Sequence, residues 1–413
     1  MIKFLLNDTQ RIKFWAIAFL LSLPLGGHVS NLILVLLSID SLQFFIRQPH
    51  SIKKAFMPIN SWLMSGFGLY LIGMLYTEDR NEGWFQVQQR LLFLLLPLLF
   101  ALHVNIWKSI RERMLTAFMF GNFIAAIFCW IRGFYVFWNG LYCEANIKGF
   151  PVYSDFSKCL HPTYASVYLL IAMGILLIQH KKRPNWMAVS GFIFLLVTLF
   201  VYSSKAALLA AFPVIVFLVL NRMAKKWRWK VGVLILLAFI ALFIFNPRIH
   251  KLQGMIKEML THQKVDTTVS SDDSNAQRTM TWKTAWQLFQ QSPWIGHGTG
   301  DSRNLSVEIY KAQHLDILVE KRLNAHNQFL EEGVKFGIWG PLWLLIGFSM
   351  AIYSGIKRRN KLLLIFVWLF VFNFLFESML QTQAGIFAFG ILLLLLFNGP
   401  RPETPSPSES VNK

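Results

Sequence analysis

The chain has 413 residues, of which 55% are hydrophobic and 15% are charged, with 38 Phe and 15 Trp. This composition is too apolar for a soluble globular protein and predicts an integral membrane protein. The formal net charge of +19 does not indicate nucleic-acid binding, because Lys and Arg sit mostly in short clusters between apolar runs. No basic and aromatic surface long enough to follow a phosphate backbone can be assembled from such loops.

The apolar runs predict an all-α fold of about twelve transmembrane helices, since a span needs about 17 to 25 residues and shorter runs suffice where flanking residues snorkel. The first run has no small-residue cleavage site after it and is predicted to be an uncleaved span. In chain order, the predicted spans lie near residues 13–27, 30–46, 57–76, 90–105, 115–138, 162–180, 186–202, 205–221, 230–246, 335–355, 361–379 and 383–398.

Six groups of basic residues fall on one predicted side of the membrane. They are Lys3, Arg11 and Lys13; Arg47, Lys53 and Lys54; Lys108, Arg111 and Arg113; Lys181, Lys182 and Arg183; Arg222, Lys225, Lys226, Arg228 and Lys230; and Lys357, Arg358, Arg359 and Lys361. By the positive-inside rule that side is cytoplasmic, and an even number of spans places both ends there. The loops 77–89 and 139–161 and the long polar segment 247–334, between the ninth and tenth spans, are then extracytoplasmic.

We interpret residues 1–399 as one polytopic membrane domain, because no segment between spans is long enough to form a separate soluble core. The tail 400–413 is rich in Pro, Ser and Glu and is predicted to be a disordered cytoplasmic end.

The three cysteines divide between a span and an outer loop. Cys129 lies in a predicted span, where simple packing is expected. Cys143 and Cys159 share the predicted outer loop, where an oxidising compartment permits a disulfide closing a loop of about 17 residues and stabilising the fold by about 3 kcal/mol. Two free thiols are the alternative.

Several cations stand at predicted outer helix ends, where orientation alone does not require them: Arg90, Arg132, Lys205 and Arg278. Snorkelling to lipid headgroups is one explanation for the first three. The other is a shared site for a lipid diphosphate, whose oxygens suit the guanidinium fork.

Residues from Ser274 onward predict an amphipathic helix. Ser274-x-x-Gln277 has capping-box spacing, and Pro293 is expected to end the helix. Arg278 would lie in its first turn, where free backbone N–H groups favour an anion. A salt bridge from Arg278 to Asp272 or Asp273 is the structural alternative. The apolar face is made by Trp282, Ala285, Trp286 and Phe289.

A second helix is predicted to begin at Asn324, which is a good N-cap, and to continue into the tenth span. His326 would lie near the second helical position, where the positive helix end favours the neutral imidazole that a general base needs. A purely structural hydrogen-bonding role is the alternative. Glu331 and Glu332 could orient His326 or simply balance charge.

A metal site is not predicted, because the histidines of the outer loops are scattered and show no i, i+4 or short-loop spacing. They are His161, His262, His297, His314 and His326. The Gly-rich stretch 296–301 lacks the ending of a P-loop and is predicted to be a turn.

Together, these motifs resemble the O-antigen ligase and O-antigen polymerase superfamily over about residues 150–395. The resemblance lies in an Arg on a helix (Arg278) before Ser292-Pro293 and a Gly-rich turn, then His326-Asn327-x-x-Leu330-Glu331 before a Gly-rich span. In addition, His161-Pro162-Thr163-Tyr164 looks like a His-Pro-x-Tyr motif of one branch. The resemblance implies a GT-C-like all-α membrane enzyme of the bacterial inner membrane with its active site on the periplasmic side.

The resemblance also implies the reaction and its residues. A glycan of O-antigen type would be transferred from undecaprenyl diphosphate to an acceptor hydroxyl. Lipid A-core is the expected acceptor. His326 would be the catalytic residue and Arg278 a diphosphate ligand. Lys205 stands where the family often has a second Arg and so lacks the bidentate fork. Apart from the resemblance, the position of Arg90 at a predicted outer helix end makes it a further candidate diphosphate ligand, and His161, Tyr164, Asn327 and Glu331 are candidate supporting residues.

The chemistry agrees with a reaction without metal or cofactor, because Arg and Lys can stabilise the leaving diphosphate. Transfer should invert the anomeric centre, since the sequence shows no candidate nucleophile dyad. Polymerase and protein O-oligosaccharyltransferase activities remain alternatives, because the sequence does not identify the acceptor. A lipid or solute carrier is a further alternative, although no inverted repeat is visible.

Overall fold

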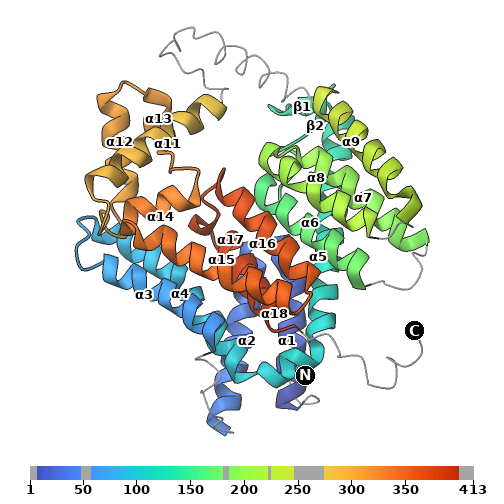
Figure 1. Ribbon diagram of the computed structural model, residues 1–413, viewed down its shortest axis with the longest axis horizontal. Coiled ribbons are helices and arrows are strands. Elements are labelled where there is room, and N and C mark those ends of the chain that lie inside the picture. The colour runs from blue at the N-terminus through green and yellow to red at the C-terminus, as the bar shows by residue number, and fades with distance from the viewer. Residues whose placement is uncertain (1–6, 48–56, 180–185, 222–224, 246–273, 400–413) are drawn as a thin grey trace.

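The computed structural model describes residues 7–47, 57–179, 186–221, 225–245 and 274–399, and these form a helical bundle (Figure 1). The α-helices are α1 Asp8–Ser22, α2 Gly27–Arg47, α3 Pro58–Gly73, α4 Arg80–Leu102, α5 Val104–Trp138, α6 Pro162–Gln179, α7 Trp186–Tyr202, α8 Lys205–Leu220, α9 Arg228–Phe245, α11 Ser274–Gln291, α12 Ser302–Ala312, α13 Asp316–Lys321, α14 Gln328–Phe336, α15 Trp339–Lys357, α16 Lys361–Phe374, α17 Gln383–Phe387 and α18 Leu393–Phe397.

Short elements complete the fold. The 3₁₀ helices are η2 Leu23–Leu25, η4 Lys225–Trp227 and η5 Met379–Gln381. One turn of π-helix, η6 Ala388–Leu392, lies between α17 and α18. One small hairpin pairs β1 Asn146–Ile147 antiparallel with β2 Phe150–Pro151 in the loop between α5 and α6.

The predicted helical fold is confirmed, because each predicted span overlaps a helix. Among the described residues, four helices are long and apolar enough to cross a membrane, namely α2, α4, α5 and α15. Shorter apolar helices cover 162–178, 186–202, 205–220, 361–374 and 383–397. The number of twelve spans stays a prediction. The predicted domain boundary between residues 399 and 400 also stays a prediction, because residues 400–413 lie outside the described residues. The first part of the predicted extracytoplasmic segment 247–334 lies outside them as well.

Helix boundaries differ from the prediction where caps and breakers decide them. α1 begins at Asp8 because Asn7 and Gln10 form a capping box, and it gives way to η2 near Pro24. The predicted continuous helix into the tenth span is wrong: α14 and α15 are separated at Gly337, whose φ is 57°. A Cβ there would lie 2.5 Å from the backbone of Trp294, so this close crossing requires glycine.

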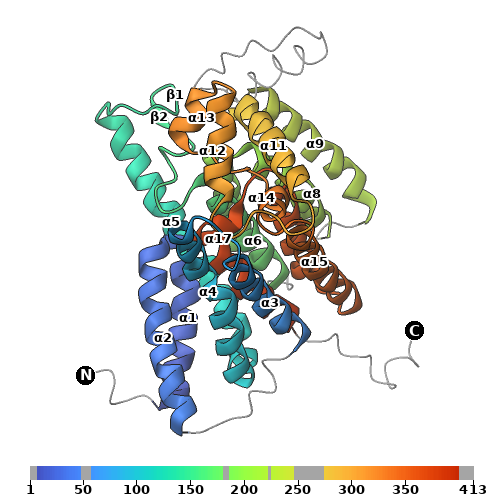
Figure 2. The same cartoon turned by 90° about the vertical axis from the view of Figure 1, so that its left-hand side faces the viewer.

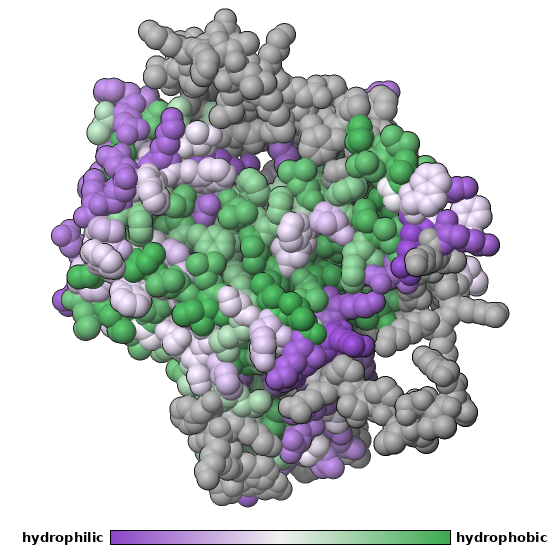
Figure 3. Space-filling view, viewed as in Figure 1, coloured by the Kyte–Doolittle hydropathy of each residue, from purple (hydrophilic) through white to green (hydrophobic). Residues whose placement is uncertain are grey.

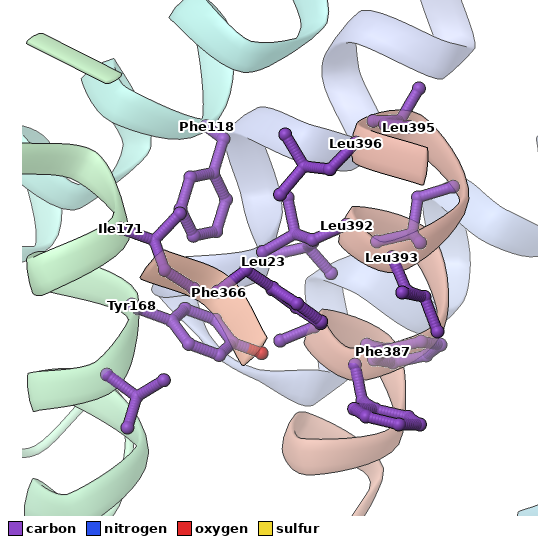
Figure 4. Close-up of a cluster of buried hydrophobic side chains, with 14 of the residues drawn as sticks. Leu23, Phe118, Tyr168, Ile171, Phe366, Phe387, Leu392, Leu393, Leu395 and Leu396 are labelled. Atoms are coloured by element: carbon purple, nitrogen blue, oxygen red, sulfur yellow. The ribbon is translucent and has the colours of Figure 1, made fainter. Parts of the chain in front are cut away.

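The last helical run lies at the centre of the bundle and not at its surface. Leu393, Leu394, Leu395 and Leu396 are all at most 2% exposed. Phe118, Tyr168 and Phe366 from three other helices belong to the same buried cluster and lie on one side of this run (Figure 4). A helix that is apolar on all sides is buried in a protein core or in a membrane, and here neighbouring helices cover it.

One face of the molecule shows a wide hydrophobic surface with hydrophilic surface at its edges (Figure 3). The α11, α12 and α13 segment lies at one end of the molecule, away from the far ends of α1 and α2 (Figure 2). An apolar band between polar ends suits a bilayer, and composition, helices and this surface together indicate a membrane protein.

Basic residues gather at the end of α18 that is opposite to η5. Arg111 Nε donates to the carbonyl of Leu395 at 2.9 Å, and Arg358 Nη1 donates to that of Phe397 at 2.9 Å. Cations at a helix C-terminus are favourable, because the helix dipole places partial negative charge there. These two contacts agree with the prediction that the Arg111 and Arg358 groups lie on one side. Other members of the six groups lie outside the described residues, namely Lys3, Lys53, Lys54, Lys181, Lys182, Arg183 and Arg222, and the cytoplasmic orientation stays a prediction.

Cysteine labelling tests this orientation. In a cysteine-free variant, single cysteines at positions 182 and 358 should resist an impermeant thiol reagent in spheroplasts, whereas one at position 311, an exposed site at the C-terminal end of α12, should react. Labelling at 182 and 358 with protection at 311 would reverse the topology and remove the periplasmic placement of the site.

The predicted disulfide is wrong, since Cys129, Cys143 and Cys159 are all free thiols. The loop folds back on α5, where the ring of Phe150 packs against those of Trp130 and Phe134. This fold brings Cys159 into hydrogen-bonding contact with Cys129 in place of Cys143. Cys129 therefore does not only pack within its helix but also contacts the loop between α5 and α6.

Candidate catalytic site

Four polar side chains from separate parts of the chain converge at the η5 end of the bundle. His326 Nδ1 lies 3.1 Å from Glu377 Oε1, and Arg278 Nε donates to the carbonyl of Phe376 at 3.3 Å. His161 interacts electrostatically with Glu377, His326 and Arg278. The sequence separations are large, so the site exists only in the folded bundle.

The backbone around His326 is a turn and not the start of a helix. His326 has φ 44°, and its N–H donates to Asn324 Oδ1 at 3.0 Å. Asn327 is the N-cap of α14, because its extended backbone lets Oδ1 accept from the Leu330 N–H at 3.1 Å. The predicted cap at Asn324, and with it the position of His326 inside the helix, is wrong by three residues.

Asn327 also ties this turn to the other half of the site. Its Nδ2 donates to the carbonyl of Leu375 at 3.1 Å, two residues before Glu377. Its predicted supporting role therefore has a structural counterpart, since one side chain caps α14 and holds the segment after α16.

Glu377 is the partner of His326 that sequence analysis did not find. Burial opposes its ionisation, but the His326 hydrogen bond and the nearby His326, Arg278 and His161 lower the pKa of Glu377 overall. An ionised carboxylate accepts hydrogen bonds only, so Nδ1 of His326 carries a proton. In the neutral ring, Nε2 then keeps its lone pair.

Glu331 and Glu332 do not contact the His326 ring, although both were candidates for orienting it. Glu331 Oε2 accepts from the Ala325 N–H at 3.2 Å, and Glu331 Oε1 lies 3.1 Å from Lys335 Nζ. Glu332 Oε1 accepts from Tyr70. Both residues belong to α14 and their side chains are buried. Glu331 contacts the backbone of Ala325, the residue before His326.

α11 forms the second wall of the site. The predicted helix is confirmed, and Arg278 is near its beginning. One turn further on, Trp282 Nε1 donates to the carbonyl of His326 at 3.3 Å. α11 therefore contacts both segments that carry the His326 and Glu377 pair. Asp272 and Asp273, the alternative partners of Arg278, lie outside the described residues.

Comparison with known protein families gives one match. Residues 190–345 match the family model described as O-antigen ligase. The resemblance to the O-antigen ligase superfamily is confirmed. The matched segment includes Lys205, Arg278 and His326, whereas Glu377 lies beyond it. No curated protein matches the chain.

The starts of α6 and α8 bring further predicted residues to the same end of the bundle. Thr163 Oγ1 lies 3.3 Å from Ser204 Oγ, the residue before Lys205. The rings of His161 and Tyr164 are 5.9 Å apart, and Tyr164 interacts electrostatically with Glu377. The His-Pro-x-Tyr motif thus faces the candidate site, and Lys205 begins the helix packed beside it.

Arg90 is buried at 0% exposure, so the snorkelling explanation fails for it. Its guanidinium carbon lies 4.5 Å from the centre of the Tyr70 ring, and Nη1 donates to Gln89 Oε1 at 2.9 Å. Nε and Nη2 are buried without a hydrogen-bond partner. Buried donors are rarely left unsatisfied, so Arg90 has capacity for an acceptor. Arg132, by contrast, donates to the backbone carbonyl of Asp155.

Within the part of the chain that the structure describes, no group of three or more His, Cys, Asp or Glu side chains could hold a metal ion. Metal independence stays a prediction.

Proposed function

We propose that the chain transfers an O-antigen-type glycan from undecaprenyl diphosphate to a hydroxyl of lipid A-core at the periplasmic face of the bacterial inner membrane. The observation that carries the proposal is the pairing of His326 with the buried Glu377 beside Arg278. The O-antigen ligase family match supports the reaction class.

His326 acts as the general base in this proposal. The acceptor hydroxyl gives its proton to Nε2 while its oxygen attacks the anomeric carbon, and the bond from that carbon to the diphosphate oxygen breaks. Glu377 holds Nδ1–H and stabilises the imidazolium that forms. The products are the glycosylated acceptor and undecaprenyl diphosphate.

Cations stabilise the leaving group. Negative charge grows on the diphosphate as the bond breaks, and fixed guanidinium and ammonium groups favour that charge without any reorganisation. Arg278 is the first ligand, because it lies next to the Glu377 segment. Lys205 and Arg90 complete the set in this proposal, and a single displacement inverts the anomeric centre.

The acceptor is tested by glycan analysis of a deletion strain. Loss of polymer from lipid A-core, with polymer retained on undecaprenyl diphosphate, supports the ligase. Accumulation of single repeat units would instead identify a polymerase. Unchanged lipid A-core with loss of glycan from proteins would identify a protein O-oligosaccharyltransferase, and a normal glycan profile would contradict the proposal.

Arg278→Lys should lower the transfer rate markedly, because Lys keeps the charge but loses the fork that binds two phosphate oxygens. Lys205→Arg should be tolerated, since it adds the fork. The measurement is the transfer rate of purified protein with a lipid-diphosphate donor. Lys283→Ala on the exposed face of α11 is the matched control. Normal donor binding and transfer by Arg278→Ala would assign Arg278 a structural role.

A further inference from the structure

The short helix α14 buries four polar side chains that the proposed reaction does not use directly. Gln328 is 0% exposed, Glu332 and Lys335 are 1% exposed, and Glu331 is 5% exposed. Burying charged and amide groups is costly unless each is paired with good geometry. A nine-residue helix with such a face therefore needs a reason beyond packing.

The side-chain amide of Gln328 makes two short hydrogen bonds. Its Nε2 donates to Glu332 Oε1 at 2.7 Å, and its Oε1 accepts from the Leu380 N–H at 2.7 Å. A backbone N–H can only donate, so the Leu380 N–H fixes Oε1 of the amide on its side and leaves Nε2 facing Glu332. Tyr70 also donates to Glu332 Oε1, at 2.8 Å, and holds the carboxylate in place.

The two ends of this link stand beside the two members of the candidate base. Gln328 follows His326 by two residues, and Leu380 follows Glu377 by three. The amide therefore connects the backbone segment that carries the imidazole to the segment that carries the carboxylate.

Lys335 makes a second connection between the same elements. Its Nζ donates to Gln381 Oε1 at 3.1 Å and also pairs with Glu331 at 3.1 Å, and Glu331 Oε2 accepts from the Ala325 N–H. The polar face of α14 thus holds η5 at one end and the turn before His326 at the other.

We propose that Gln328 is a positioning residue that sets the separation and orientation of His326 and Glu377. The inference rests on the proposed function, because it concerns the base of that reaction. Reacting groups misplaced by about 1 Å can lose about 100-fold in rate, so a link between the two segments acts on turnover more than on donor binding.

An exchange of the two partners tests this role. Gln328→Glu places a second carboxylate against Glu332 and should lower kcat at least about 10-fold, with the donor KM unchanged. The double variant Gln328→Glu with Glu332→Gln should recover most of kcat. The new carboxylate at 328 can accept from the Leu380 N–H and from the new amide at 332. The formal buried charge stays the same.

The outcomes separate this proposal from the proposed function. Wild-type kcat in folded Gln328→Glu would overturn it, as would a folded exchange variant without recovery. If Gln328→Glu does not fold, kcat of the exchange variant against Glu332→Gln alone still decides. His326→Asn in the same assay tests the base itself. Wild-type activity of His326→Asn would contradict the proposed function. An inactive His326→Asn together with a fully active Gln328→Glu would contradict only the positioning role.

Discussion

His326→Asn should lower the rate of glycan transfer by about 100-fold to 10,000-fold, the range typical for loss of a general base. Asn is a better replacement than Ala, because residue 326 has φ 44° and Asn tolerates the left-handed region. Protein level and donor affinity should remain normal, since the side chain acts on the acceptor proton in the transition state. Single-turnover transfer by purified protein measures the effect.

His314→Asn is the matched control for this variant. His314 is an exposed histidine in the same polar segment, and its φ of 56° also lies in the left-handed region. The backbone demand of the substitution is therefore similar, and the rate should not change. An equal loss in both variants would show that the effect comes from the turn backbone and not from a base.

Glu377→Gln should also cost about 100-fold or more in rate, although the side chain keeps its size. The carboxylate accepts the Nδ1 proton of His326, at 3.1 Å. An amide can also donate to Nδ1, which allows the proton to stand on Nε2, where the base must be free. In the Ser-His-Asp triad, the same kind of substitution acts mainly by favouring the wrong tautomer.

Glu308→Gln on the exposed side of α12 is the control for the change of charge. Nitrogen NMR of labelled histidine would report which ring nitrogen of His326 is protonated in each variant. A fully active Glu377→Gln protein, or an unchanged tautomer with lost activity, would separate Glu377 from the base.

Much of the fold follows from apolar runs of spanning length, because burial of such runs against lipid or against each other strongly favours helices. What the runs do not encode is which helix becomes central. Residues 383–397 look like an ordinary last span, yet in the structure residues 385–396 are buried in the cluster that includes side chains of α6 and α16. The ends of helices likewise depended on individual caps, such as Asn327 in place of Asn324.

The candidate site was predictable as far as local motifs reach. Arg278 and His326 stand in recognisable patterns, and the structure brings both to the same turn. Glu377 was hidden at the end of an apolar run, although an ionisable residue within a predicted span is itself a signal of function. The pairing of Glu377 with His326 could not be predicted, because the two residues are 51 positions apart and Glu377 follows the end of α16 at Phe374.

The most direct test of the account is single-turnover transfer from undecaprenyl diphosphate-linked glycan to lipid A-core by purified wild-type and His326→Asn proteins, each with EDTA. We expect wild-type transfer to be unaffected by the chelator and His326→Asn to bind the donor but transfer it at least about 100-fold more slowly. Wild-type rates in folded His326→Asn protein would contradict the assignment of the base. A wild-type rate abolished by EDTA and restored by a divalent metal would contradict a reaction driven by Arg, Lys and His alone.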